Sequence, residues 1–361
     1  MEPIIDAVIA SAFAAWRQGN ESRALELFGE LVRVRPDAYL ARLYLGRLLT
    51  LKGQDTAAAV QYARALQDAQ RRGQWRNRAS TPDGLAPFVE DAVRSVRETR
   101  QKAHAALLEP LIARHGRAAL GRVASCLAMY LGAEPPRRAD PRQDPSFLYF
   151  PDLPSLPYID SATIPQVQAL AEAAPRIRAE LDQLRATGGT AERVFGSTEL
   201  EAENLRGAGR APQWDGHYFY RHGLRREAAL EACPASAAAI DRLPLARIRE
   251  HAPEVLFSVF SGGTHLLPHR GVSNLRIVGH LALIVPPECA LRVADQTYRW
   301  REGEVVLFDD TYLHEAWNRS DSDRVVLIFD LWNPHLTASE RDAMQTAIEA
   351  IGDFRKLVDA A

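Results

Sequence analysis

Two histidines and one arginine in the last third of the chain have the spacing of a metal site. The histidines would bind the metal, and the arginine would bind an anion beside it. His269 and His314 lie 45 positions apart, each among short runs of β-type residues, and Arg324 follows ten positions after the second histidine. A catalytic non-haem Fe(II) needs neutral imidazoles on rigid strands, with coordination positions left open for a chelating co-substrate and O2. The spacing therefore predicts a double-stranded β-helix that presents Fe(II) on facing strands.

Arg324 opens the strand-like run RVVLIFDLW. The alternation of a strand places Arg324, Val326, Ile328 and Asp330 on one face. A guanidinium directed into an apolar interior needs an anion, and the distal carboxylate of 2-oxoglutarate would supply one in bidentate geometry. The alternative for the histidines is an ordinary antiparallel barrel in which they are buried and hydrogen-bonded, because neutral histidine is often internal.

The segment from about residue 145 to residue 334 resembles the aspartyl/asparaginyl β-hydroxylase family of Fe(II)- and 2-oxoglutarate-dependent oxygenases. The similarity is carried by FLYFPDLPSLPYID at 147–160, FSVFSGGTHLLPHRG at 257–271, NLRIVGHLAL at 274–283, Trp300 with Gly303, the FDDxxxHExWN block at 308–318, and Arg324. The resemblance implies that His269 and His314 are the iron ligands. It further implies that Arg324 and Ser258 hold the distal carboxylate of 2-oxoglutarate, with His280 near its other end.

Two positions depart from the common pattern of these oxygenases. Most of them carry a carboxylate ligand two residues after the first histidine, where this chain has Gly271. The animal aspartyl hydroxylases that the chain resembles also lack this carboxylate and work with two histidines. We expect Asp310, four residues before the second histidine, to hold a water in that position. Val278 stands where the animal enzymes carry a second arginine, two residues before His280. Arg276 remains on that strand face, and its partner is either the substrate carboxylate or the near end of 2-oxoglutarate.

The first third of the chain carries an imperfect repeat with a period of 34 residues. The repeated positions are Gly19, Ala24, Phe28 and Leu31, which recur as Gly53, Ala58, Tyr62 and Ala65, with Leu45 and Gly46 at the start of the second unit. Small residues at this helix-turn-helix period are typical of tetratricopeptide repeats, in which they let helices approach closely. Any amphipathic helical hairpin is the alternative. Two repeats are too few for a free solenoid, so they must pack on the residues that come after them.

The rest of the chain has the pattern of further helices and then strands. Residues 84–131 have helical periodicity, residues 132–145 are rich in proline and charge, and a helix is expected over 164–186. At 361 residues the chain is long for a single core. We therefore predict an α+β chain with an α-helical repeat domain at 1–135. A double-stranded β-helix (jelly-roll or cupin-like) oxygenase domain at 145–340 and a C-terminal helix at 341–361 complete it.

Composition excludes several other classes of protein. The hydrophobic content of 47%, the charged content of 25% and the formal net charge of −2 are ordinary for a globular protein and offer no basic surface for nucleic acid. The opening residues carry acids where a signal peptide needs Lys or Arg, and no apolar run approaches the roughly 18 residues that span a bilayer. Three scattered cysteines fit a reducing compartment. We expect a cytoplasmic protein that does not enter a membrane.

These observations together predict a dioxygenase that uses Fe(II), 2-oxoglutarate and O2 to hydroxylate an unactivated carbon. The resemblance implies that this is the β-carbon of an aspartyl or asparaginyl residue, in a peptide, on a carrier or in a free amino acid, with the helical repeats available to a protein partner. Arg276, helped by Arg210 and Arg221, would meet a substrate carboxylate. The alternatives are a non-catalytic repeat adaptor with a degenerate barrel, a cupin that works without 2-oxoglutarate, and a hydroxylase of another small carboxylate or acyl substrate.

Overall fold

The computed structural model describes residues 2–189, 191–194, 203–208 and 211–361, and these form two compact units. The first unit comprises the residues up to Leu111 together with Ala350–Ala361, and the second comprises Ile112–Glu349. Helix α5 (Ala86–His115) and helix α12 (Ala338–Ala360) each contribute residues to both units. The domain limits expected from the sequence, near residues 135, 145 and 340, stay predictions.

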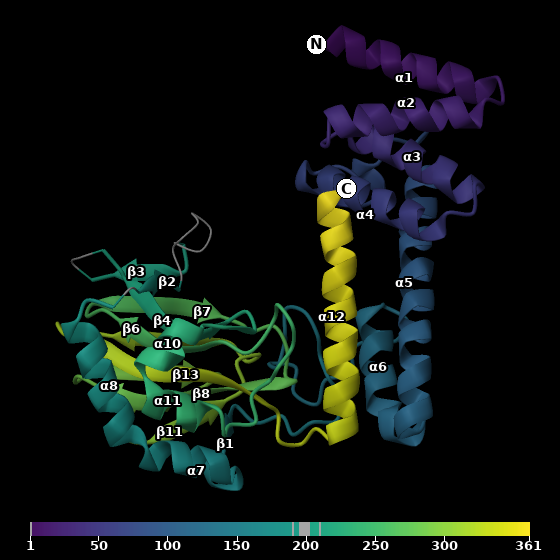
Figure 1. The fold of residues 1–361 in the computed structure, drawn as a ribbon. Helices are drawn as coiled ribbons and strands as arrows, with labels where there is room; N and C mark the ends of the chain where they lie inside the picture. The colour runs from purple at the N-terminus through teal and green to yellow at the C-terminus, as the bar shows by residue number, and fades with distance from the viewer. Residues whose placement is uncertain (1, 190, 195–202, 209–210) are drawn as a thin grey trace. The chain divides into compact units, whose positions relative to one another are not determined.

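The first unit is built from helical hairpins (Figure 1). Its first four helices are α1 (Glu2–Arg17), α2 (Glu21–Val34), α3 (Tyr39–Leu51) and α4 (Asp55–Arg71). A Cβ on Gly46 would lie 2.6 Å from ring carbons of Tyr62. The glycine therefore allows α3 and α4 the close approach that the repeat pattern predicts at this position. The assignment to tetratricopeptide repeats stays a prediction.

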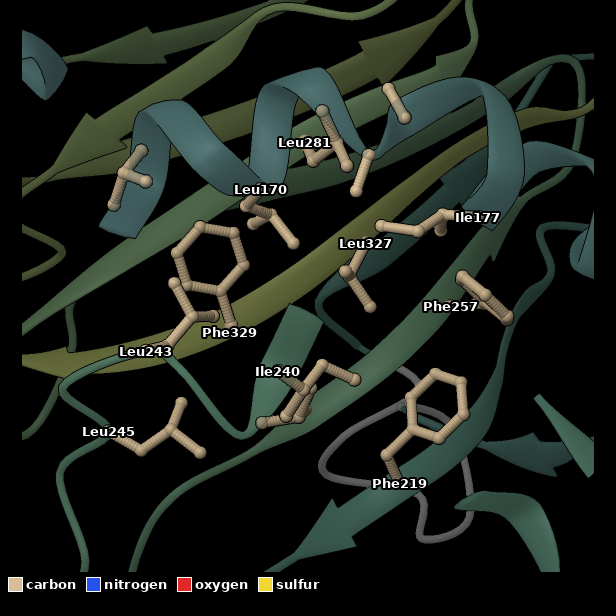
Figure 2. Close-up of a cluster of buried hydrophobic side chains, with 14 of the residues drawn as sticks. Leu170, Ile177, Phe219, Ile240, Leu243, Leu245, Phe257, Leu281, Leu327 and Phe329 are labelled. Atoms are coloured by element: carbon tan, nitrogen blue, oxygen red, sulfur yellow. The ribbon is translucent and has the colours of Figure 1, made fainter. Parts of the chain in front are cut away.

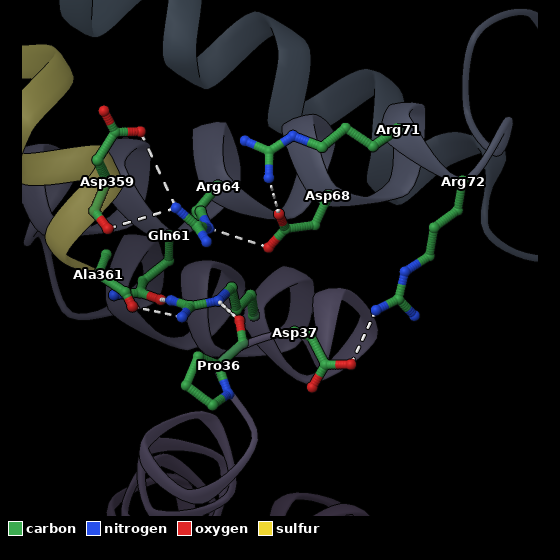
Figure 3. A network of polar contacts seen from close by, with 10 residues as sticks. Pro36, Asp37, Gln61, Arg64, Asp68, Arg71, Arg72, Asp359 and Ala361 are labelled. Carbon is green, nitrogen blue, oxygen red and sulfur yellow. Dashed lines mark hydrogen bonds and ion pairs between the residues drawn. The ribbon is translucent and has the colours of Figure 1, made fainter. Parts of the chain in front are cut away.

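A buried arginine ties the last residues of α12 into the first unit. Arg42, on α3, is fully buried. It donates hydrogen bonds to the carbonyl of Pro36 at 3.0 Å, to Oε1 of Gln61 at 2.8 Å and to the carbonyl of Ala361. Arg64 of α4 donates to the carbonyl of Asp359 at 3.3 Å, as Figure 3 shows. The three hydrogen bonds of Arg42 satisfy its guanidinium, which would otherwise be costly to bury.

The second unit contains two antiparallel sheets. The larger sheet has the strand order β1 (Tyr158–Ile159), β11 (Val305–Phe308), β8 (Arg276–Ile284), β13 (Arg324–Trp332), β6 (Val255–Phe260), β4 (Trp214–Arg221), β2 (Glu192–Arg193), and β5 (Leu224–Arg225) pairs with β4. The smaller sheet has the order β10 (Gln296–Tyr298), β9 (Cys289–Val293), β12 (His314–Asn318), β7 (Thr264–His269), β3 (Leu205–Gly207). The chain is thus α+β, with N-terminal helices followed by antiparallel sheets, as the sequence predicts.

Helices cover the outer face of the larger sheet. They are α7 (Pro165–Glu172), α8 (Ala174–Ala186), α10 (Glu227–Ala232) and α11 (Pro234–Ile240), while α6 (Gly121–Tyr130) precedes the sheets. Figure 2 shows Leu170 and Ile177 of these helices in one buried cluster with Leu327 and Phe329 of β13. The single helix predicted over 164–186 is in fact two, because Pro175 in the first turn of α8 cannot donate back into a preceding helix.

The opposite, inner face of the larger sheet packs against the smaller sheet. Their shared core contains Val278 of β8 and Val326 of β13 from one sheet and Leu291 of β9 and Ala316 of β12 from the other. Val325, Leu327, Phe329 and Leu331 of β13 instead belong to the helix-covered core. The alternation that the sequence predicts for this strand is confirmed, and Arg324 shares the inner face with Val326. No helix in the described ranges is long and apolar enough to cross a bilayer.

Candidate active site

The two predicted metal ligands lie side by side on neighbouring strands of the smaller sheet. His269 ends β7, His314 begins β12, and the two residues are direct partners in the register of these strands. Their ring centroids are 4.1 Å apart. The structure therefore brings together two imidazoles that are 45 positions apart in the sequence.

Hydrogen bonds to the backbone select the same tautomer for both histidines. Nδ1 of His269 donates to the carbonyl of Leu267 at 2.8 Å, and Nδ1 of His314 donates to the carbonyl of Tyr312 at 3.1 Å. The proton on Nδ1 puts the lone pair of each ring on Nε2, an atom that binds metals. Burial lowers the pKa of His269 and lowers that of His314 to about 3. Both rings are thus neutral at physiological pH, as metal ligands must be.

A carboxylate occupies the place where a third ligand would be attached. A Cβ built on Gly271 would lie 2.1 to 2.2 Å from the carboxylate carbon and oxygens of Asp310. The Gly271 amide also donates to the Asp310 carbonyl at 2.6 Å. Oδ1 of Asp310 is buried without a hydrogen-bond partner, and burial raises the pKa of this carboxyl. Glycine at 271 therefore makes room for the carboxylate of residue 310.

Arg276 is held by two carboxylates of the chain itself. Its Nη2 donates to Oδ2 of Asp310 at 2.9 Å, and its Nη1 donates to Oδ1 of Asp330 at 2.5 Å. Neither partner expected from the sequence, a substrate carboxylate or the near end of 2-oxoglutarate, is needed to satisfy this guanidinium. The two partners expected from the sequence stay predictions, while the structure pairs Arg276 with Asp310 and Asp330.

Arg324 is a buried guanidinium whose hydrogen-bonding capacity is not met. It is 3% exposed, and its Nε and Nη1 have no hydrogen-bond partner. Its charged carbon lies 4.8 Å from the ring centre of Phe260 and 4.9 Å from that of Trp300. Burial lowers its pKa to about 10, so it stays charged at neutral pH. A buried cation without an anion is strongly unfavourable, and this position is therefore built to receive one.

Further donors surround Arg324. His280 stacks on Trp300 with ring centres 5.9 Å apart, and both His280 Nδ1 and Trp300 Nε1 are buried without partners. Ser258 is fully buried on β6, and its Oγ accepts a hydrogen bond from Nε1 of Trp214 at 2.9 Å. Burial and the charge of Arg324 hold the pKa of His280 well below its usual value. Ser258, His280 and Arg324, three of the predicted cofactor-binding residues, thus lie on three neighbouring strands of the larger sheet, β6, β8 and β13.

Trp300 and Asp330 lie in this site, but from the sequence neither of them was given a role there. Trp300 was visible only as part of a motif, and Asp330 only as a residue on the face of Arg324. Strand alternation was a usable signal for Asp330, because an acid on the inner face of a buried strand needs a cation. In the described chain, no group of three or more His, Cys, Asp or Glu side chains is placed to hold a metal ion. The assignment of His269 and His314 as metal ligands stays a prediction.

His265, four residues before His269, lies on the other face of the smaller sheet. Its Nε2 lies 2.7 Å from Oε2 of Glu315, and its ring contacts Trp317 edge-on. It lines a shallow surface hollow of about 400 Å³ together with Arg206 and Arg319. It is therefore a surface residue and does not join the two site histidines.

Comparison with known proteins finds similarity over the part of the chain that contains these residues. Residues 171–334 match the aspartyl/asparaginyl β-hydroxylase family. The human aspartyl/asparaginyl beta-hydroxylase is 34% identical over 145 residues, which are 40% of this chain and 19% of that protein. The ornithine lipid ester-linked acyl 2-hydroxylase of Rhizobium tropici is 33% identical over 195 residues, 52% of this chain and 64% of that protein.

A third relative, the human aspartate beta-hydroxylase domain-containing protein 2, is 30% identical over 206 residues, 56% of this chain and 54% of that protein. The chain thus spans between about a fifth and two thirds of the length of these relatives. The matched residues contain both histidines, Asp310 and Arg324. Residues 171–334 thus match the aspartyl/asparaginyl β-hydroxylase family, and the site described above lies within that match.

Proposed function

We propose that this chain is an Fe(II)- and 2-oxoglutarate-dependent dioxygenase that hydroxylates an unactivated carbon. The observation that carries the proposal is Arg324, a buried guanidinium with unmet donors in the same inter-sheet core as two neutral histidines. Iron with its co-substrate would supply the oxidation, in which O2, 2-oxoglutarate and a C–H bond become the C–OH product, succinate and CO2.

The metal would be held by His269 and His314 through Nε2. The residues fit a metal ion, because both rings are neutral and the Nδ1 hydrogen bonds fix their orientation. Asp310 would hold a water in the position that a ligand at residue 271 takes in other oxygenases. Its unpartnered Oδ1 supports this role. Arg276 keeps that carboxylate in place by pairing with its other oxygen.

The co-substrate would be held by Arg324 and Ser258 at its distal carboxylate. Nε and Nη1 of Arg324 are both buried without partners, so this guanidinium has donors available to a carboxylate. Ser258 already accepts a hydrogen bond from Trp214, so its own hydroxyl proton can be donated to an anion. His280 and Trp300 add two more unmet groups beside this carboxylate.

Several finer features belong to the same proposal. The two sheets would form a double-stranded β-helix, and the helical hairpins would be tetratricopeptide repeats that contact a protein partner. The relatives' names refer to aspartyl or asparaginyl residues and to an ester-linked acyl chain. The substrate would accordingly be a peptide, a carrier-bound group, a free amino acid or an acyl chain. The protein would act in the cytoplasm.

The first test is anaerobic reconstitution with Fe(II) followed by titration with 2-oxoglutarate. We expect the weak visible charge-transfer band of an Fe(II)–2-oxoglutarate chelate in the wild type. The band should be absent in His314→Ala, because one imidazole cannot hold the metal at comparable affinity. Iron bound per chain, measured by metal analysis after gel filtration, should fall in parallel.

The matched control is His265→Ala, which removes an imidazole from the other face of the same sheet. Its partner Glu315 also pairs with Arg292, so the fold should tolerate the change. The band should persist at wild-type strength in this variant. A wild type that binds no iron, or a His314→Ala variant with an unchanged band, would contradict the proposed site.

A further inference from the structure

We propose that the part of the substrate that reaches His269 and His314 is uncharged and apolar, an acyl-type chain rather than an aspartyl carboxylate. This inference rests on the proposed function and narrows its substrate class. It departs from the aspartyl side chain that the resemblance implies. Three features of the site support it, namely the pairing of its cations, its balance of charge and the apolar side chain of Val278.

The arginines that could bind a substrate carboxylate already form ion pairs with acids of the chain. Both ends of the Arg276 guanidinium bind carboxylates of the chain, Asp310 at 2.9 Å and Asp330 at 2.5 Å. Arg221, also considered from the sequence, pairs with Glu192. Arg210 lies outside the described residues. Within the part of the inner face that the structure describes, Arg324 is the cation that lacks an acidic partner, and the proposed function assigns it to 2-oxoglutarate.

The charges of Arg276, Arg324, Asp310 and Asp330 would cancel those of the proposed iron and co-substrate without a substrate anion. Fe(II) would bring two positive charges, and Arg276 and Arg324 bring one each. Asp310 and Asp330 bring one negative charge each, and 2-oxoglutarate brings two. A further carboxylate would therefore be buried without compensation, which is strongly unfavourable in a region of low dielectric. Glu254 also lies beside Asp330, to which its amide donates at 2.9 Å, and it makes the surroundings of Arg276 more acidic.

Val278 adds an apolar surface to the inner face of β8. It lies between Arg276 and His280 on that face and packs in the inter-sheet core. An apolar side chain at this position gives no compensation to a buried carboxylate, so it favours an apolar ligand.

The test adds a positive charge to the site and measures whether an aspartyl ligand is then preferred to an apolar one. Two capped tripeptides, Gly-Asp-Gly and Gly-Leu-Gly, present side chains of the same branching that differ in charge. Their binding to the anaerobic Fe(II)–2-oxoglutarate protein is measured by calorimetry and by perturbation of the charge-transfer band. We expect the wild type to bind the aspartyl probe no better than the leucyl probe. Val278→Arg should prefer the aspartyl probe by about tenfold or more.

Val278→Gln is the control, because it adds length and polarity at the same position without charge. Asp330→Asn is a second variant in case Val278→Arg does not fold, since it removes one acid and also leaves one positive charge in excess. The inference is overturned if the wild type prefers the aspartyl probe by about tenfold, or if both folded variants gain no preference for it. A wild type without the charge-transfer band, before any probe is added, would instead count against the proposed function.

Discussion

Gly271→Ala is expected to lower hydroxylase turnover by about a hundredfold, although the substitution adds a single methyl group. The new Cβ would lie 2.1 to 2.2 Å from the carboxylate of Asp310, far inside contact distance. The carboxylate must then move away from Arg276 and from the proposed metal position. Overpacking of this kind should also lower the free energy of unfolding by about 1–3 kcal/mol. Fe(II) affinity should fall as well, because the displaced carboxylate no longer supports the proposed metal position. Fe(II) titration, 2-oxoglutarate turnover and denaturant unfolding measure the losses of affinity, activity and stability.

A double substitution tests whether the site needs a carboxylate in this space, whichever residue supplies it. Asp310→Ala alone should weaken Fe(II) binding, because no acid is left to hold a water beside the histidines. Gly271→Asp with Asp310→Ala returns a carboxylate to the same space from the other residue, and it should bind Fe(II) more tightly than Asp310→Ala.

Gly29→Ala, at a helical glycine of α2 with nothing within 4 Å of the added Cβ, is the control and should leave Fe(II) affinity unchanged. Wild-type Fe(II) affinity in Gly271→Ala would show that Asp310 has no part in the metal site.

The parts of the site that could be predicted from the sequence depend on local periodicity. Alternation along β13 correctly placed Arg324 and Asp330 on one face, and alternation along β8 did the same for Arg276 and His280. The two histidines could be paired because their spacing and flanking motifs match a known family. Predicting these features needs only the alternation within one strand or a sequence motif.

The partners of Arg276 could not be predicted, because they depend on the register between strands. Asp330 lies opposite Val278 in the pairing of β13 with β8, which places it diagonally beside Arg276. Asp310 reaches the same guanidinium from the loop between β11 and β12. A shift of one residue in that register would turn Asp330 to the other face. The choice between a substrate carboxylate and 2-oxoglutarate as partner of Arg276 was therefore incomplete, since two acids of the chain were absent from it.

The two buried arginines are expected to respond in opposite directions when each is replaced by methionine. Arg324→Met removes an unpaired charge and leaves an apolar side chain of similar length. The ligand-free protein should become more stable by about 1–4 kcal/mol. The faces of Phe260 and Trp300 recover part of the cost of burying Arg324, about 2 kcal/mol for a desolvated contact. Arg276→Met instead leaves Asp310 and Asp330 without their cation, and should destabilise the protein by about 3–5 kcal/mol.

Addition of 2-oxoglutarate should then reverse the order of the wild type and Arg324→Met. In the proposed site the distal carboxylate would pair with the guanidinium of Arg324 and stabilise the wild type, and the variant has lost that guanidinium. The concentration of 2-oxoglutarate needed for half-saturation should rise about a hundredfold in Arg324→Met. Thermal unfolding of the metal-loaded protein with and without 2-oxoglutarate measures both effects. A ligand-free Arg324→Met as unstable as Arg276→Met would mean that Arg324 is already paired, and the site would then have no need of the anion on which the proposed function depends.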